Sequence, residues 1–186
     1  MTERKVSMEE TLAKVDEVEG PGEFPLHDEL RWHEPSFQIV KAMIVAHPNR
    51  VMASNESGMM ALHVFARNLV NPEILALLLE HYPEAVKTPN NFGQLPIHKA
   101  ASCRHADGEA FKALIQAHPK GLSAKNKDGC TPLHVSVTGV RPNLTVVGTL
   151  LREGPKAAKR RCKRGQTPMH KLAASFIPVE DTKDTM

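Results

Sequence analysis

A four-residue motif that ends in histidine returns at nearly constant intervals, and it restricts the fold more than any other feature of the chain. Successive histidines are 36, 35, 36 and 36 residues apart, at His27, His63, His98, His134 and His170. A glycine stands five residues before every one of these histidines, and a proline stands fifteen residues before each of the last four. A period of this length predicts a stack of similar supersecondary units.

The apolar residues that precede each proline predict one helix in every unit. Positions eight, five and four residues before the proline are apolar and have helical spacing, as in Leu75, Leu78 and Leu79 before Pro83. Proline should end this helix because it has no backbone N–H to continue the hydrogen-bond ladder.

The histidine motif predicts the start of a second, shorter helix. Pro132 suits the first helical position, where a missing N–H is not needed, and the hydroxyl of Thr131 can cap the helix. An Asn-x-x-Gly sequence before the motif favours a tight turn, because glycine readily adopts left-handed backbone angles. Each unit should therefore comprise a hairpin-like loop, a short helix and a longer helix.

These elements predict an all-α helical repeat solenoid of four full helix-turn-helix units and one terminal half unit, joined by hairpin-like loops. The expected units are 22–57, 58–92, 93–128 and 129–164, with the half unit at 165–176. Residues 1–21 form an acidic segment, in which 8–18 is interpreted as a capping helix or, alternatively, as part of a frayed tail. Residues 177–186 are expected to be a flexible C-terminal tail.

The stretches "DGCTPLHVSV" and "RGQTPMHKLAAS" resemble the ankyrin repeat, whose motif reads "DGxTPLHxAA". The resemblance covers roughly residues 22–176, with the motif at 24–27, 60–63, 95–98, 131–134 and 167–170. The units are longer than the usual 33 residues of that family. Phe24, Met60 and Leu95 replace the capping threonine, and Ala61 replaces the proline. The resemblance implies that the histidine ring bridges the helix start and the hairpin backbone, and that the stack presents a protein-binding surface.

The motif histidines are expected to be structural, with no metal and no cofactor. Equivalent residues of neighbouring units should lie about 8–10 Å apart, whereas zinc ligands lie about 2.0–2.1 Å from the ion. Cys103, His105 and Cys130 leave open a metal site or a redox pair, although incidental buried cysteines are commoner. Cys130 follows the hairpin glycine, where a variable and often solvent-facing residue is expected.

The sequence predicts a protein without enzymatic activity in an intracellular compartment, cytoplasmic or nuclear. It contains no phosphate-binding glycine loop, no HExxH and no GxSxG motif. Three widely spaced cysteines argue against a disulfide framework and for a reducing compartment. No apolar run is long enough to span a membrane, and a net charge of +3 dictates no partner.

Residues that differ between the otherwise similar units are the candidates for binding a protein partner. The identity of this partner and the oligomeric state of the chain stay open. Phe92 is the best single anchor, because aromatic residues dominate interface hot spots; alternatively, it packs on the neighbouring hairpin. The candidates at the hairpin tips are Glu56, Ser57, Asn91, Phe92, Lys127, Asp128, Lys163 and Arg164. Those on or near the short helices are Val64, Arg67, Lys99, Ser102, Cys130, Val135 and Thr138.

The segment 156–164 is the one strongly basic stretch of the chain. The simplest interpretation is a solvated hairpin. The alternatives are a nuclear-import signal or a patch for an anionic partner such as nucleic acid. No aromatic stacking platform accompanies it, which argues against specific single-strand binding. Its basic residues are Lys156, Lys159, Arg160, Arg161, Lys163 and Arg164.

Overall fold

The computed structural model describes residues 25–31, 34–138 and 142–175. The capping helix expected at 8–18, the start of the first unit and the tail at 177–186 lie outside these residues. In chain order the α-helices and 3₁₀ turns are α2 (Pro25–Arg31), α3 (Phe37–Ala46), η1 (Pro48–Val51), α4 (Ala61–Phe65), α5 (Pro72–His81), η2 (Pro83–Lys87), α6 (Pro96–Ala101), α7 (Gly108–Ala117), η3 (Pro119–Ser123), α8 (Pro132–Ser136), α9 (Leu144–Glu153), η4 (Pro155–Lys159) and α10 (Pro168–Ser175).

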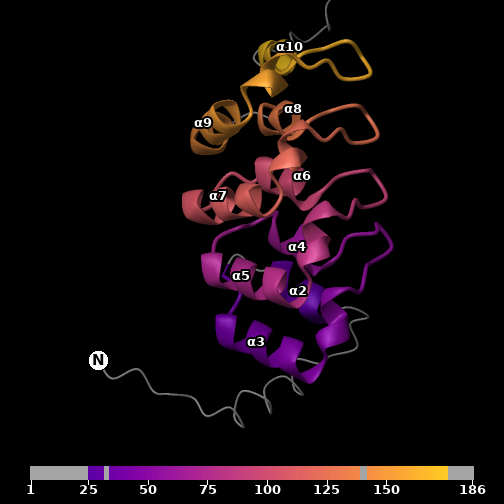
Figure 1. Cartoon of the computed structure of the whole chain (residues 1–186), viewed down its shortest axis with the longest axis vertical. Helices are drawn as coiled ribbons and strands as arrows, with labels where there is room; N and C mark the ends of the chain where they lie inside the picture. Colours follow the sequence, from indigo (N-terminus) through magenta and orange to yellow (C-terminus); the bar gives the residue numbers. More distant parts are fainter. Residues whose placement is uncertain (1–24, 32–33, 139–141, 176–186) are drawn as a thin grey trace, which may run out of the picture.

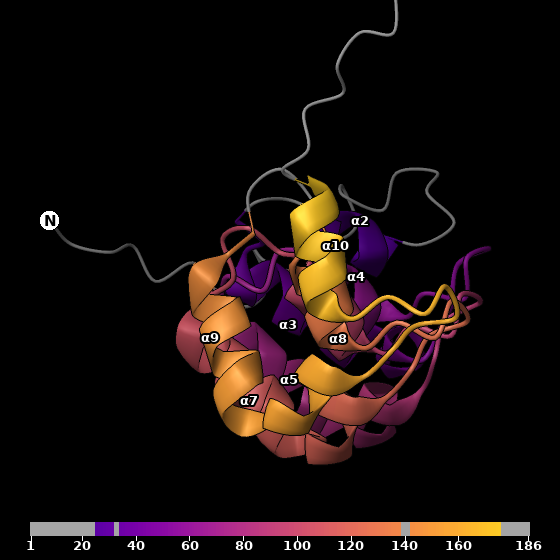
Figure 2. The same cartoon turned by 90° about the horizontal axis from the view of Figure 1, so that it is seen from above.

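The elements form a regular stack in which each unit repeats the one below it (Figure 1). The short helices α2, α4, α6, α8 and α10 form one column, and the longer helices α3, α5, α7 and α9 form a second. Seen along the stack, the connecting loops project together on one side (Figure 2). The described residues contain an isolated bridge between Ser54 and Met60 but no extended strand. The predicted all-α repeat solenoid is therefore confirmed.

Each longer helix ends where the proline pattern predicts, but the chain then winds into a 3₁₀ turn. These turns bury an apolar anchor such as Val51, Val86 or Leu122 against the core. The predicted apolar face of the longer helices is buried in α3 and α7, whereas Leu151 of α9 keeps 41% of its surface exposed. Leu151 is exposed because only the short helix α10, and no further long helix, follows α9 among the described elements.

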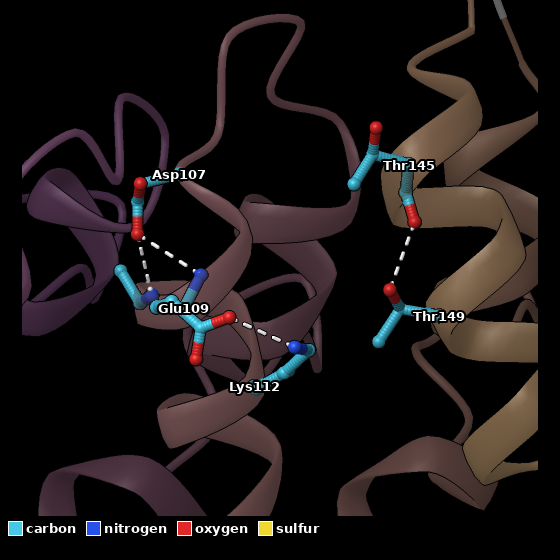
Figure 3. A network of polar contacts seen from close by, with 6 residues as sticks. Asp107, Glu109, Lys112, Thr145 and Thr149 are labelled. Carbon is cyan, nitrogen blue, oxygen red and sulfur yellow. Dashed lines mark hydrogen bonds and ion pairs between the residues drawn. The ribbon is translucent and has the colours of Figure 1, made fainter.

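The longer helices α5, α7 and α9 begin with a polar side-chain cap that the sequence pattern of apolar residues does not reveal. Asn71, Asp107 and Asn143 each stand one residue before a longer helix, and 36 residues separate neighbours in this series. In α7, Oδ1 of Asp107 accepts hydrogen bonds from the N–H groups of Glu109 at 3.0 Å and Ala110 at 2.8 Å (Figure 3). The side chain thus satisfies backbone donors that have no partner within the helix.

Replacing Asp107 with alanine should lower the free energy of unfolding by about 1 kcal/mol, because two helix N–H groups lose their acceptor. Asp107→Asn is the matched control, since its amide oxygen can accept the same bonds, and it should cost only a few tenths of that loss. The exposed ion pair between Glu109 and Lys112, at 2.8 Å, should contribute little. Urea denaturation followed by circular dichroism measures all of these effects, and equal losses in the two Asp107 variants would contradict the capping role.

Candidate protein-interaction surface

The motif histidines use one ring nitrogen within their own unit and the other to reach the next hairpin. Nδ1 of His63 accepts the N–H of Met60 at 3.3 Å, and Nε2 donates to the carbonyl of Gln94 in the next hairpin at 3.0 Å. The ring is therefore neutral, with its proton on Nε2. The same bridge to the next hairpin joins His27 to Met59, His98 to Cys130 and His134 to Gln166.

Burial controls the titration of these histidines. Desolvation lowers the pKa of His63 and of His98 to about 4, although backbone carbonyls that accept hydrogen bonds from the rings oppose the shift. Burial lowers the pKa of His27 and His134 in the same way. These rings remain uncharged at neutral pH and hold the stack together as neutral hydrogen-bonding groups.

The threonine of the motif does not cap its helix in the expected way. The Thr131 hydroxyl lies 2.9 Å from Nδ1 of His134, which also accepts the Thr131 N–H at 3.2 Å. Because the imidazole accepts this N–H whatever side chain precedes the helix, Met60 and Leu95 occupy the same position with the same backbone bond. Replacing the threonine therefore leaves this backbone hydrogen bond at the helix start in place.

The hairpins are held in register by backbone hydrogen bonds from one unit to the next. The N–H of Asn91 donates to Ser57 at 3.0 Å, that of Lys127 to Phe92 at 3.0 Å, and that of Lys163 to Asp128 at 2.9 Å. These bonds join the tip residues themselves, so the tips form a row with fixed spacing along one side of the stack (Figure 2). The backbone of the row is regular, whereas its side chains differ from unit to unit.

Most of the predicted tip residues are exposed. Phe92 presents 55% of its surface to solvent, and Ser57 is half-buried. Phe92 thus stands out from its hairpin as an apolar side chain available to a partner. The other exposed members of the row are Glu56, Asn91, Lys127, Asp128, Lys163 and Arg164.

The structure separates the predicted residues of the short helices into accessible and inaccessible ones. Arg67, Ser102 and Thr138 are exposed, and Lys99 and Val135 are half-buried. Val64 is only 1% exposed and lines a hollow together with Arg31, Arg67 and Asn68. Burial and the nearby Arg67 charge lower the pKa of Lys99, so these two basic side chains, from α6 and the turn after α4, lie close enough to interact.

Cys130 is buried, with 4% of its surface exposed, which corrects the expectation of a solvent-facing thiol. Lys171 of α10 covers it, with Nζ 3.1 Å from the sulfur. Cys103 is also buried and donates to the carbonyl of Asn68 at 3.0 Å. No group of three or more His, Cys, Asp or Glu residues suited to hold a metal ion occurs within residues 25–31, 34–138 and 142–175.

The basic segment 156–164 lies on η4 and the fourth hairpin, with all six of its predicted basic side chains exposed. None of the salt bridges found among the described residues involves it. The hairpin is shaped instead by hydrogen bonds to carbonyls, from Arg161 to Gly165 at 2.7 Å and from Lys125 to Arg161 at 3.0 Å. The segment therefore presents uncompensated positive charge.

The stacked units, the histidine bridges and the row of hairpin tips define a helical repeat protein with an extended side surface. Residues 78–136 match the family model described as ankyrin repeats (many copies). These residues are therefore similar to ankyrin repeats, and the resemblance is confirmed for the motifs at 95–98 and 131–134 that lie among them. Ankyrin repeats generally act as protein-interaction modules.

A comparison with curated proteins finds no significant match. Among the helices that the structure describes, none has the length and apolar character to cross a bilayer.

Proposed function

We propose that this chain is a non-enzymatic scaffold that binds a protein partner, in the cytoplasm or the nucleus, through the hairpin tips and the exposed part of the short-helix face. The observation that supports this most is the row of tips: a backbone fixed by hydrogen bonds between units carries side chains that vary. A fixed row reduces the entropy cost of binding, because the loops are ordered before the partner arrives.

The chemistry of the row indicates what kind of partner it fits. Glu56 lies at one end, Phe92 is exposed in the next hairpin, and Lys163 with Arg164 lies at the other end. A matching partner surface would offer an apolar pocket for the aromatic ring and acidic groups opposite the basic end. On the short helices, Arg67 and Lys99 would add a further contact for acidic groups.

The double variant Phe92→Ala with Lys127→Ala should keep the fold and weaken partner binding on the order of tenfold or more, since it removes the proposed hot spot and a neighbouring charge. A partner is first isolated with the intact chain, and its dissociation constant is then measured by titration calorimetry. Lys112→Ala is the matched control, because this exposed residue lies on α7, away from the hairpin tips. Equal affinities for the double variant and the wild type would rule out the tip surface.

A second candidate function follows from the uncompensated charge of the basic segment: binding of nucleic acid or another anionic partner, or recognition as a nuclear-import signal. Binding through phosphate contacts alone should be weak and should fall steeply as salt increases. Fluorescence anisotropy with a labelled duplex at several salt concentrations tests direct nucleic-acid binding. A lack of affinity at low salt would exclude direct nucleic-acid binding. Affinity that survives replacement of Lys159, Arg160 and Arg161 with alanine would mean that another part of the chain binds the nucleic acid.

A further inference from the structure

The fourth hairpin contains a cysteine where the three hairpins before it contain an asparagine. In the third hairpin, Oδ1 of Asn126 accepts the N–H groups of Asp128 at 3.0 Å and Cys130 at 2.9 Å. Asn55 and Asn90 accept from the residues two and four positions later in the same way. This pattern means that the hairpin backbone presents two N–H donors to whatever side chain occupies the asparagine position.

Cys162 occupies that position in the fourth hairpin, and its backbone closes the same turn, with its N–H donating to Gln166 at 2.9 Å. The backbone N–H groups of Arg164 and Gln166 are hydrogen-bonded to its sulfur. Two N–H donors directed at one sulfur stabilise a thiolate more than a neutral thiol, because the donors bind the negative charge more strongly. The hairpin therefore forms a small anion-binding nest around Cys162.

A second thiol and a positive charge complete the cluster. Cys130, from the preceding hairpin, makes a side-chain hydrogen bond to Cys162, and Nζ of Lys171 lies 3.1 Å from the Cys130 sulfur. Burial alone would raise the pKa of Cys162, but the two N–H groups, the Lys171 charge and the Cys130 thiol outweigh it and hold the pKa below its usual value. Burial raises the pKa of Cys103, where it outweighs the opposing backbone hydrogen bond from His105.

The backbones of the two hairpins approach each other closely beside the two cysteines. The N–H of Lys163 donates to Asp128 at 2.9 Å. A Cβ placed on Gly129 would lie 3.3 Å from the carbonyl carbon of Cys162. Cys162 adjoins Lys163, and Cys130 adjoins Gly129, so both cysteines lie next to these contacts. A disulfide between them needs Cα atoms about 4.4–6.8 Å apart.

We propose that Cys162 is a peroxide-reactive cysteine and that Cys130 resolves its oxidised form, so that a reversible disulfide joins the third and fourth hairpins. The Cys162 thiolate attacks one oxygen of hydrogen peroxide, the O–O bond breaks, and the released hydroxide takes up a proton to leave as water. Cys130 then attacks the sulfur of the resulting sulfenic acid, the S–O bond breaks, and a second water leaves with the Cys130 proton. The two thiols are oxidised together and the peroxide is reduced to two waters.

Both cysteines are buried, with Cys130 4% and Cys162 7% exposed, and they lie in the last two described hairpins, where a disulfide would have a mechanical consequence. Hydrogen peroxide is little larger than water, and in the described part of the chain no further repeat unit stacks on the fourth hairpin. A disulfide would add a covalent link to the single backbone bond that holds the fourth tip to the third. It would thereby restrain Lys163 and Arg164 relative to Lys127 and Asp128.

The test treats the reduced full chain with stoichiometric hydrogen peroxide and maps the cysteines by mass spectrometry without a reducing agent. We expect a linked peptide that contains Cys130 and Cys162, has lost two hydrogen atoms and is restored by dithiothreitol. Cys162 should react on the order of tenfold faster than the equally buried Cys103, which serves as the internal control. In Cys130→Ser, a sulfenic acid trap such as dimedone should label Cys162.

Cys162→Asn is the matched variant, because asparagine is the residue of the other three hairpins and should preserve the turn. In this variant Cys130 should stay reduced under the same treatment. The proposal is overturned if the wild type forms no Cys130–Cys162 link, if Cys103 reacts as fast as Cys162, or if the only disulfides join separate molecules. Circular dichroism of each variant verifies that the fold is intact, so that every result bears on the chemistry.

Discussion

Lowering the pH from about 7.5 to about 5 should reduce the free energy of unfolding by about 4 kcal/mol through His63 and His98 alone. Burial holds the pKa of each ring at about 4 in the folded chain, against 6.5 for an ordinary histidine. Well above pH 6.5 the two rings are neutral in both the folded and the unfolded chain, so they do not change the free energy of unfolding. Between pH 6.5 and 4 the unfolded state binds protons that the folded state does not, so stability falls as the pH falls.

Urea titrations at several pH values measure this dependence directly. His98→Asn provides the control: it should be less stable at pH 7.5, because the N–H of Leu95 and the carbonyl of Cys130 lose their ring partners. It should also lose about half of the pH dependence that His63 and His98 contribute together, since one of these two rings is gone. A wild-type stability that stays flat between pH 7.5 and 5 would mean that the rings titrate normally and are not held neutral.

The landmarks that made the fold predictable are residues with a local backbone requirement. Proline marks the end of each longer helix because it cannot donate a hydrogen bond, and the hairpin glycines have positive φ, for example +74° at Gly129. Such requirements act on a few consecutive residues and are visible in one sequence. Because the motif returns every 35–36 residues, the structure predicted for one unit could be extended to the whole stack.

The parts of the surface that could not be predicted depend on contacts between units. Val64 and Val135 both follow a motif histidine, yet Val64 is buried and Val135 is half-buried, a difference that the shared motif does not predict. Cys130 is buried because Lys171, 41 residues away, lies over it. Sequence spacing alone does not report such long-range contacts.

The missed features had a signal in the sequence. Asn71, Asp107 and Asn143 recur every 36 residues, one residue before α5, α7 and α9. A search for polar columns as well as apolar ones would have found these caps. Cys162 had a signal too, because it interrupts the asparagine column at the fourth hairpin. What spacing could not show is that its sulfur accepts the same two backbone N–H groups and meets Cys130.

Gly129→Ala should lower the free energy of unfolding by about 2–4 kcal/mol, because two costs combine at this residue. Its φ of +74° is strained for a residue with a side chain. In addition, the new Cβ would lie 2.8 Å from the backbone nitrogen of Lys163, an atom that already donates to Asp128. The hairpins would have to separate, and the bond between the third and fourth tips would weaken.

Gly165 separates these two costs, because it has nearly the same φ of +73° but no atom within 4 Å of an added Cβ. Gly165→Ala should therefore cost only the backbone strain, about 1–2 kcal/mol. The difference between the two variants, measured by urea denaturation at pH 7.5, isolates the close approach of stacked hairpins. Equal losses would show that the hairpins move apart easily, in which case the row of tips is not the rigid surface that the proposed binding function requires.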